Sequence, residues 1–533
     1  MKRKAWIFSI ALPALLCAGP AWTHEGEAPS GGLGKVSFAN SCSEKTKPKF
    51  ERGVAMLHSF WYSAGEKTFD EILAEDPQCA IAAWGLASIL MNNPLAGAGA
   101  SPAAAKKAMA ALEHAHKVRA GTQRERDYID AVATYYEDFA NRGERARQVA
   151  RAAAYGMLAE HYPDDDEAQI FNALYIAGTQ TQSDQTYAAY LKAAGILEGQ
   201  FRKHPEHPGV AHYLIHSYDA PPIAEKGLEA ARRYAGIAPD APHALHMPSH
   251  IFTRVGAWEE SIVTNQRSMD VARKGNEPDE AYHASDYMVY ANLQLGRDAE
   301  ARRIVDEAMK VAGASPGRFV APYSVAAMPA RLVLERGDWK GAAALPVTPT
   351  TYAFAEAITH FARAIGAARS GDITTARNAS EALAGLHRKL DAAKNNYWAT
   401  EVEIQRLAAA GWIALAEGKQ DEALKFMRAA ADLEDRNEKH IVTPGRVLPA
   451  RELLGDMLLE LKQPKPALAE FQASQLREPN RFRNLYGSAL AADAAGDKAA
   501  AARYFAQAAA LTAKGDTARP EIARARMAMA SPR

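Results

Sequence analysis

The chain has 533 residues, of which 48% are hydrophobic and 24% charged, and its 63 basic residues balance its 63 acidic residues. With a net charge of zero, the chain has no excess of positive charge of the kind that binds nucleic acid or an anionic membrane surface. This length far exceeds what one compact core needs, so we expect several domains or an extended array of repeats.

The first 21 residues have the features of a secretory signal peptide. Three basic residues at positions 2–4 precede an apolar run that is too short to span a membrane, and small residues follow near Ala21. We therefore expect a periplasmic or secreted protein with no transmembrane segment after signal cleavage. Residues 22–45 are rich in Gly, Pro and Ser and are expected to form a flexible leader.

Two cysteines, Cys42 and Cys79, remain after removal of the signal peptide. An oxidising compartment would permit a disulfide between them, a point that the sequence leaves open. Neither cysteine lies beside a histidine-rich or redox motif, so we predict no catalytic cysteine.

From Phe50 onward the composition favours helices, and turn residues recur at regular spacing. Gly337 and Gly371 are separated by the length of a tetratricopeptide helix-turn-helix repeat, roughly 34 residues, as are Lys462 and Gly496. We predict an all-α fold, a right-handed α-solenoid of tetratricopeptide-type repeats. Its expected parts are N-terminal helical repeats (46–200), histidine-rich repeats (201–310), further helical repeats (311–400) and C-terminal tetratricopeptide repeats (401–533).

Two segments of the histidine-rich part, PGVAHYLIH and PHALHMPSH, superpose when one is shifted by a single repeat length. His212 then coincides with His246, and His216 with His250. Histidines four residues apart lie on one face of a helix, and this spacing is that of a two-histidine metal clamp. Seven of the 16 histidines fall between His204 and His250, which chance clustering explains poorly.

Further metal-competent residues extend this pattern into the neighbouring turns of helix. Asp219 follows His216 by three residues, and His243 precedes His246 by three. In the next repeat, aligned through Gly256 and Gly296, His283 and Asp286 fall at equivalent positions. The first helices of such repeats line the concave face at a spacing of about 8–10 Å, so their side chains can meet at one ion. The predicted metal-binding set is His212, His216, Asp219, His243, His246, His250, His283 and Asp286.

Nitrogen and carboxylate donors without cysteine suit zinc, copper(II) or non-haem iron more than copper(I). Eight candidates exceed the needs of one tetrahedral ion, so either two ions share the site or some groups orient the ligands. An open coordination position would permit hydrolysis or oxygen chemistry, but nothing in the sequence selects a reaction or establishes that the chain is an enzyme.

Three alternatives stay open beside the metal site. The histidines can each be buried, hydrogen-bonded packing residues. The chain can be a metal-free scaffold whose concave groove binds a peptide or a protein of the cell envelope. A His283–Asp286 pair could act in acid/base catalysis without metal.

The remaining histidines receive separate interpretations. We expect His204 and His207 on a surface loop, His58 in the core, and His360 as a candidate distal ligand. We predict a solvated position for His114, His116, His161, His387 and His440.

The C-terminal third resembles ordinary tetratricopeptide repeats. The segment from Met56 to about Gly371, with LHSFWYSAGEKTFDEILAEDPQCAIAAWGLA and HALHMPSHIFTRVGAWEES, is similar to exported bacterial repeat proteins. It more distantly resembles the tetratricopeptide repeat domain 38 group, in which paired histidines four apart also occur on repeat helices. The resemblance implies an α-solenoid and carries no activity to transfer.

Overall fold

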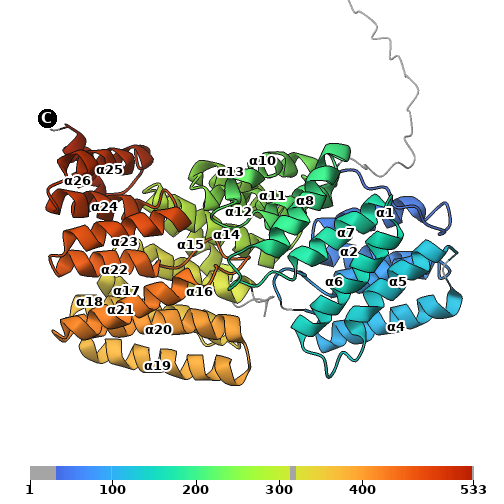
Figure 1. The fold of residues 1–533 in the computed structure, drawn as a ribbon, viewed down its shortest axis with the longest axis horizontal. Coiled ribbons are helices and arrows are strands. Elements are labelled where there is room, and N and C mark those ends of the chain that lie inside the picture. Colours follow the sequence, from blue (N-terminus) through green and yellow to red (C-terminus); the bar gives the residue numbers. More distant parts are fainter. Residues whose placement is uncertain (1–31, 98, 120, 312–319, 531–533) are drawn as a thin grey trace, which may run out of the picture.

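The computed structural model describes residues 32–530 except 98, 120 and 312–319, and the predicted signal peptide lies outside this range. All regular elements of the described part are helices, and successive helices pack as antiparallel hairpins (Figure 1). The predicted all-α solenoid of helix-turn-helix repeats is therefore confirmed. Among the described residues, no helix combines the length and the apolar character needed to cross a bilayer.

The helices divide into three consecutive groups. The N-terminal group contains α1 (Lys47–His58), α2 (Tyr62–Glu75), α3 (Ile81–Leu90), α4 (Pro102–Val118), α5 (Gln123–Tyr136), α6 (Glu144–His161), α7 (Asp166–Ala177) and α8 (Ala188–Lys203). The histidine-bearing group contains α9 (Pro208–Ser217), the short 3-10 helix η2 (Ala224–Gly227), α10 (Leu228–Ile237), α11 (Pro242–His246), α12 (Pro248–Arg254), α13 (Trp258–Lys274), α14 (Pro278–Gln294) and α15 (Asp298–Val311). The C-terminal group contains α16 (Val320–Leu334), α17 (Trp339–Ala343), α18 (Ala353–Ser370), α19 (Ile373–Ala392), α20 (Asn396–Ala416), α21 (Gln420–Asp435), α22 (Ala450–Glu460), α23 (Pro464–Arg477), α24 (Phe482–Ala494), α25 (Lys498–Leu511) and α26 (Pro520–Ala530).

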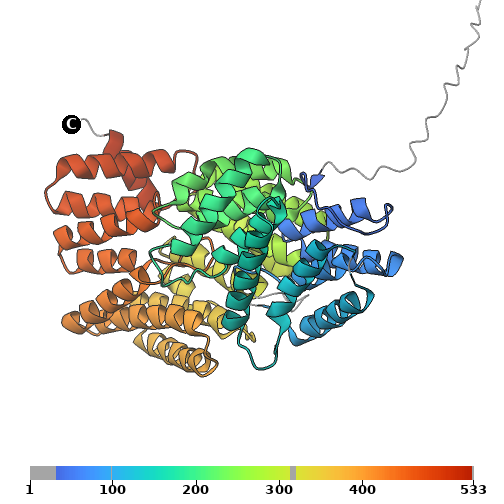
Figure 2. The same ribbon diagram turned by 45° about the vertical axis from the view of Figure 1, so that its right-hand side comes forward.

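These groups form a continuous stack. The expected boundaries at residues 200, 310 and 400 fall inside α8, α15 and α20, so they do not separate the repeats. In Figures 1 and 2 the histidine-bearing helices lie between the N-terminal and C-terminal repeats.

The turn residues that indicated repeats in the sequence occupy one backbone conformation. Gly256, Gly296, Gly371 and Gly418 follow the first helices of their hairpins with φ between 66° and 87°. Lys462, which stands at the equivalent place after α22, has a φ of 61°. A positive φ at this position ends a helix and turns the chain back, and glycine adopts it without strain. The repeat period therefore reflects a recurring left-handed turn.

Residues 32–45 pack against the protein, so the predicted flexible leader is wrong for this part. Phe38 is 1% exposed and its ring contacts Phe50, Trp84 and Tyr128. Cys42 forms a disulfide with Cys79, and this bond ties the segment to the turn between α2 and α3. A single aromatic anchor and the covalent link outweigh the Gly- and Ser-rich composition on which the prediction relied.

The inner face of the solenoid is filled by its own chain. The bridging loop, defined as residues 436–449 between α21 and α22, is mostly buried. In it the N–H of Glu438 donates to the carbonyl of Gln182 at 2.8 Å, and Lys439 lies 3.3 Å from Asp219. Arg331 of α16 donates to two carbonyls of the same loop. The loop thus joins helices that are far apart in the sequence and occupies space that an open groove would leave free.

Substitutions at Lys462 and at Gly418 should change the stability of the turn in opposite directions. A left-handed backbone costs a non-glycine residue about 1–2 kcal/mol, so Lys462→Gly should stabilise the turn by up to about 1 kcal/mol after the added freedom of the unfolded chain is counted. Gly418→Ala should destabilise its turn by a similar amount, because a Cβ there meets no atom within 4 Å and only the backbone strain acts. Hydrogen exchange of the flanking helices measures the change in stability of each variant. Changes of the same sign in the two variants would contradict a left-handed turn at both positions.

Candidate metal centre

Six histidines converge in the middle of the stack from four helices. His212 and His216 come from α9, His243 and His246 from α11, and the last two are His250 of α12 and His283 of α14. Each of the six is between 0% and 8% exposed. They form two groups of three, and within each group one ligand atom per residue lies within 4.8 Å of the others. We name the group His212, His216 and His243 the first trio, and the group His246, His250 and His283 the second trio.

The two trios are repeats of one another. Each consists of a pair four residues apart, on α9 in the first trio and across α11 and α12 in the second, and a third histidine from the next inner helix. The two pairs are one repeat length apart, and the third members, His243 and His283, are separated by the longer spacing of the following repeat. These are the spacings of the repeat turns, so one local arrangement is built twice along the solenoid.

The second trio places two unprotonated nitrogens face to face. Nδ1–H of His246 donates to Oδ1 of Asn265 at 2.7 Å, and Nδ1–H of His250 donates to Oδ2 of Asp219 at 2.9 Å. The amide of Asn265 is oriented by its own donation to the carbonyl of Ser261 at 2.7 Å. A neutral imidazole carries one hydrogen, so each Nε2 has a lone pair, and the two Nε2 atoms are 3.0 Å apart. No proton remains to bond them.

The first trio also leaves buried ring nitrogens without partners, but at different atoms. Nδ1–H of His212 donates to the carbonyl of His58 at 2.6 Å, which leaves a lone pair on Nε2, 3.1 Å from Nε2 of His216. His216 can donate its only hydrogen there, but its Nδ1 is then a buried acceptor with no partner among the described residues. Nε2 of His243 is likewise buried without a partner in the described structure. Buried polar atoms without partners are rare and call for an explanation.

Burial keeps these rings neutral. It lowers the pKa of His250 to about 4, and it lowers the pKa values of His212, His216, His246 and His283 well below the ordinary value. At neutral pH, therefore, neither ring of a pair takes up a second proton that could form a hydrogen bond between the two Nε2 atoms. Neutral imidazoles are the form in which histidine binds a metal ion.

The two carboxylates of the predicted set do not join either trio. Asp219 holds His250 in place and is itself bound by Arg254 at 2.7 Å and by Lys439. Burial alone would raise the pKa of Asp219, but Lys439 and Arg254 outweigh it and hold that pKa well below the ordinary value. Asp286 is engaged by Arg331 at 3.0 Å. The structure thus places Asp219 as an orienting group and Asp286 in a separate ion pair.

Pro248 divides the helix that carries the second pair. α11 ends at His246 and α12 begins at Pro248, because proline has no N–H to continue the hydrogen-bond ladder. The Nε2 atoms of His246 and His250 nevertheless lie as close as those of His212 and His216 on the unbroken helix α9. The break between α11 and α12 therefore does not disrupt the pair.

A third histidine cluster is saturated with ordinary hydrogen bonds. Nε2–H of His58 and Nε2–H of His207 donate to the two oxygens of Glu167 at 2.9 and 3.0 Å. The hydroxyl of Tyr213 donates to Nδ1 of His58, and the N–H of Val210 donates to Nδ1 of His207. Every ring nitrogen has a partner of the correct kind. The hydrogen bonds of this cluster are therefore complete without a metal ion.

His207 is 5% exposed, so the predicted surface position is wrong, whereas the expected core position of His58 is confirmed. The proline-rich sequence suggested a loop, but His207 is the N-cap of α9 and turns inward to Glu167. His440 was also predicted to be solvated, yet it is buried in the bridging loop against Trp398. His360 is half-buried beside Glu356 and belongs to neither trio.

Several residues that shape the cluster were not singled out in the sequence. Phe60 has a φ of 51° in the turn after α1, and its ring lies 4.4 Å from that of His212 and 5.6 Å from that of His243. A left-handed non-glycine residue at a buried site stores strain that the surroundings must hold. Asn265, Glu280 and Lys439 orient or face the histidines from other helices, and sequence spacing gives no signal for such contacts.

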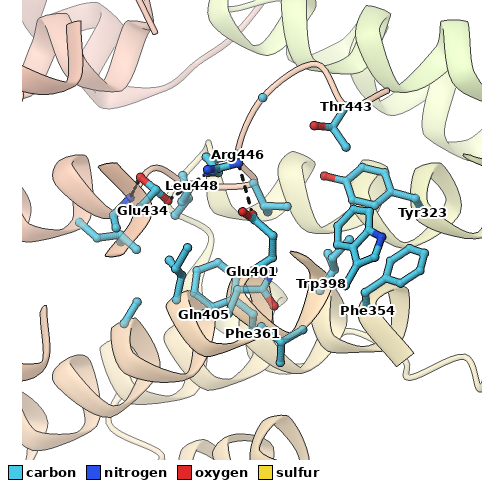
Figure 3. Close-up of a pocket in the computed structure, with 18 of the residues that line it drawn as sticks. Tyr323, Phe354, Phe361, Trp398, Glu401, Gln405, Glu434, Thr443, Arg446 and Leu448 are labelled. Carbon is cyan, nitrogen blue, oxygen red and sulfur yellow. Dashed lines mark hydrogen bonds and ion pairs between the residues drawn. The ribbon is translucent and has the colours of Figure 1, made fainter. Parts of the chain in front are cut away.

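A separate pocket lies under the other end of the bridging loop (Figure 3). Trp398 and other aromatic side chains line it together with Glu401 and Glu434, which lie 3.3 and 3.5 Å from Arg446 of the loop. Burial raises the pKa of Glu434 to about 8. None of the six histidines lines this pocket.

Comparison with known proteins adds little to this description. No family model and no curated protein matches the chain. Among solved structures, the APC/C hetero-tetramer Cut9–Hcn1 gives 12% identity over 91% of this chain and 96% of that chain, with a TM-score of 0.30. Human IFIT1 in a dimer with m7Gppp-AAAA gives 11% identity over 77% of this chain and 87% of that chain, with a TM-score of 0.35. Likenesses this weak carry no argument about function.

The buried rings predict a steep loss of stability in acid for the metal-free protein. Histidines of the unfolded chain take up protons below about pH 6.5, whereas the buried rings do so only at lower pH, about 4 for His250. The unfolded state then binds more protons, so the free energy of unfolding falls by about 1.4 kcal/mol per pH unit for each such ring as the pH decreases through this window.

Urea denaturation at pH 7.5, 6 and 5 measures this slope. His250→Gln should reduce the slope of the unfolding free energy against pH by the contribution of one ring, about 1.4 kcal/mol per pH unit. A stability that stays constant between pH 7.5 and 5 would contradict burial of neutral histidines.

Proposed function

We propose that the chain is a metal-binding helical-repeat protein in which each trio binds one transition-metal ion. The observation that carries this proposal is the contact between the two Nε2 lone pairs of His246 and His250 at 3.0 Å. Two lone pairs facing each other in a dry site repel, and a cation between them turns the repulsion into two bonds.

The distances fit a shared ion. Nitrogens bind such metals at about 2.0–2.1 Å, so two donors that subtend about 90–110° at the ion are about 2.9–3.4 Å apart. The pairs in the two trios, at 3.1 and 3.0 Å, fall within this range. The Nδ1 hydrogen bonds to the His58 carbonyl, Asn265 and Asp219 are of the kind that orients metal-bound imidazoles.

Export to an oxidising compartment is part of the proposal. The basic and apolar character of residues 1–21 and the disulfide between Cys42 and Cys79 support it. So does the resemblance to exported bacterial repeat proteins and, more distantly, to the tetratricopeptide repeat domain 38 group.

The metal-free scaffold is less well supported at this face. A peptide in the concave groove would need the space that the bridging loop occupies, where Glu438 and Lys439 form ion pairs with Arg254 and Asp219. The lone-pair contact of the second trio and the unpartnered nitrogens of the first also have no role in a scaffold.

Metal content and a matched histidine control test the proposal. Protein purified from its native compartment, or reconstituted with Zn²⁺ or Cu²⁺ and desalted, should carry two ions per chain by elemental analysis. His246→Ala should reduce this to about one, because the first trio stays intact. His207→Gln, which changes a buried histidine of the saturated cluster, should leave it unchanged.

Circular dichroism establishes that both variants are folded before metal is counted. Equal metal content in the wild type and in folded His246→Ala protein would refute the assignment. If His207→Gln loses metal instead, the metal site is at the third cluster, formed by His58, Glu167 and His207.

A further inference from the structure

The donor set of the two trios favours a cation of low charge. The sequence pattern had suggested carboxylate ligands, but Asp219 and Asp286 are engaged by Arg254, Lys439 and Arg331 and leave only neutral imidazoles to face an ion. The cost of burying an ion grows with the square of its charge, so a divalent ion pays about four times the desolvation cost of a monovalent one. Among transition metals that imidazole binds, copper has an accessible monovalent state.

The two trios are also close to each other. The rings of His216 and His250 have centroids 5.7 Å apart, and those of His243 and His246 have centroids 5.9 Å apart. Each of these contacts joins one trio to the other. Ions held by three imidazoles each would therefore lie side by side, each with a coordination position that no carboxylate or thiolate of the trios fills.

The surroundings limit what can reach these positions. All six histidines are at most 8% exposed, and Phe60 and Tyr287 pack against them. The hydroxyl of Tyr287 lies 3.3 Å from Nε2 of His250, to which it can donate a hydrogen bond, so it stands beside the atom that would bind a metal ion. Histidines this deeply buried are closed to an organic substrate.

We propose that the paired trios bind two copper ions and that this copper pair binds dioxygen reversibly. The inference rests on the proposed metal-binding function. In the oxygenated state each Cu(I) gives one electron to O2, which yields two Cu(II) ions and one peroxide dianion bound between them. Release returns both electrons to the copper ions and frees O2, so no other oxidant or reductant takes part. The hydroxyl of Tyr287 is placed to donate a hydrogen bond to the bound peroxide.

The experiment uses the mature protein loaded anaerobically with Cu(I) supplied as its acetonitrile complex. After removal of excess copper, exposure to O2 should give uptake of one O2 per two copper ions. A peroxide-to-copper absorption band should appear in the near ultraviolet, and the oxygenated protein should lack the electron paramagnetic resonance signal of isolated Cu(II). Purging with argon should reverse all three changes.

Matched variants separate this inference from metal binding itself. His246→Ala should retain about one copper ion and bind at least tenfold less O2, whereas His207→Gln should behave as the wild type. Zn²⁺-loaded protein, whose metal has no redox chemistry, should bind none. Tyr287→Phe should raise the rate of O2 release without changing the copper content.

The outcomes distinguish two failures. If the folded wild type retains no copper, both the metal-binding proposal and this inference fail. If it retains two copper ions but takes up no O2, or if O2 converts them irreversibly to isolated Cu(II), metal binding stands and the copper pair as an oxygen site is overturned.

Discussion

The arrangement of hydrogens on His246 and His250 constrains everything else at this site. Asn265 and Asp219 each accept the only hydrogen of a neutral ring, so the two Nε2 lone pairs meet at 3.0 Å with nothing between them. The hydroxyl of Tyr287 can donate to Nε2 of His250, but Nε2 of His246 has no donor among the described residues, and a buried acceptor without a donor costs about 1–3 kcal/mol. The fold holds the contact rigidly from three helices, which is what a preformed ligand set requires.

The saturated cluster of His58, Glu167 and His207 shows the contrast within the same molecule. There each imidazole has one donor contact and one acceptor contact, and the buried carboxylate accepts from both rings. Gly209 makes this possible, because a Cβ at that position would lie 2.3 Å from Nδ1 of His58. Gly209 stands where the next repeat has His243, so this position leaves room for the packed His58 in one repeat and supplies a metal-competent histidine in the next.

The bridging loop connects the site to the rest of the solenoid. Lys439 and Arg254 neutralise Asp219, which in turn fixes His250, and Glu438 pairs with Arg254. A segment from the C-terminal repeats therefore sets the charge around histidines that lie far earlier in the chain. The ion pairs are nearly fully buried, where removal of one partner costs far more than it does at a surface.

The sequence by itself determined the helical class, the repeat turns and the two histidine pairs, because these depend on local spacing along a helix of fixed geometry. It also placed His243 and His283 at equivalent positions of successive repeats, where they are the third members of the two trios. Only the tertiary structure decided that Asp286 pairs with Arg331, that His207 and His440 are buried, and that residues 32–45 are packed. Those outcomes depend on partners that are distant in the chain. The stacking of the repeats brings these partners together, and local sequence spacing does not predict such contacts.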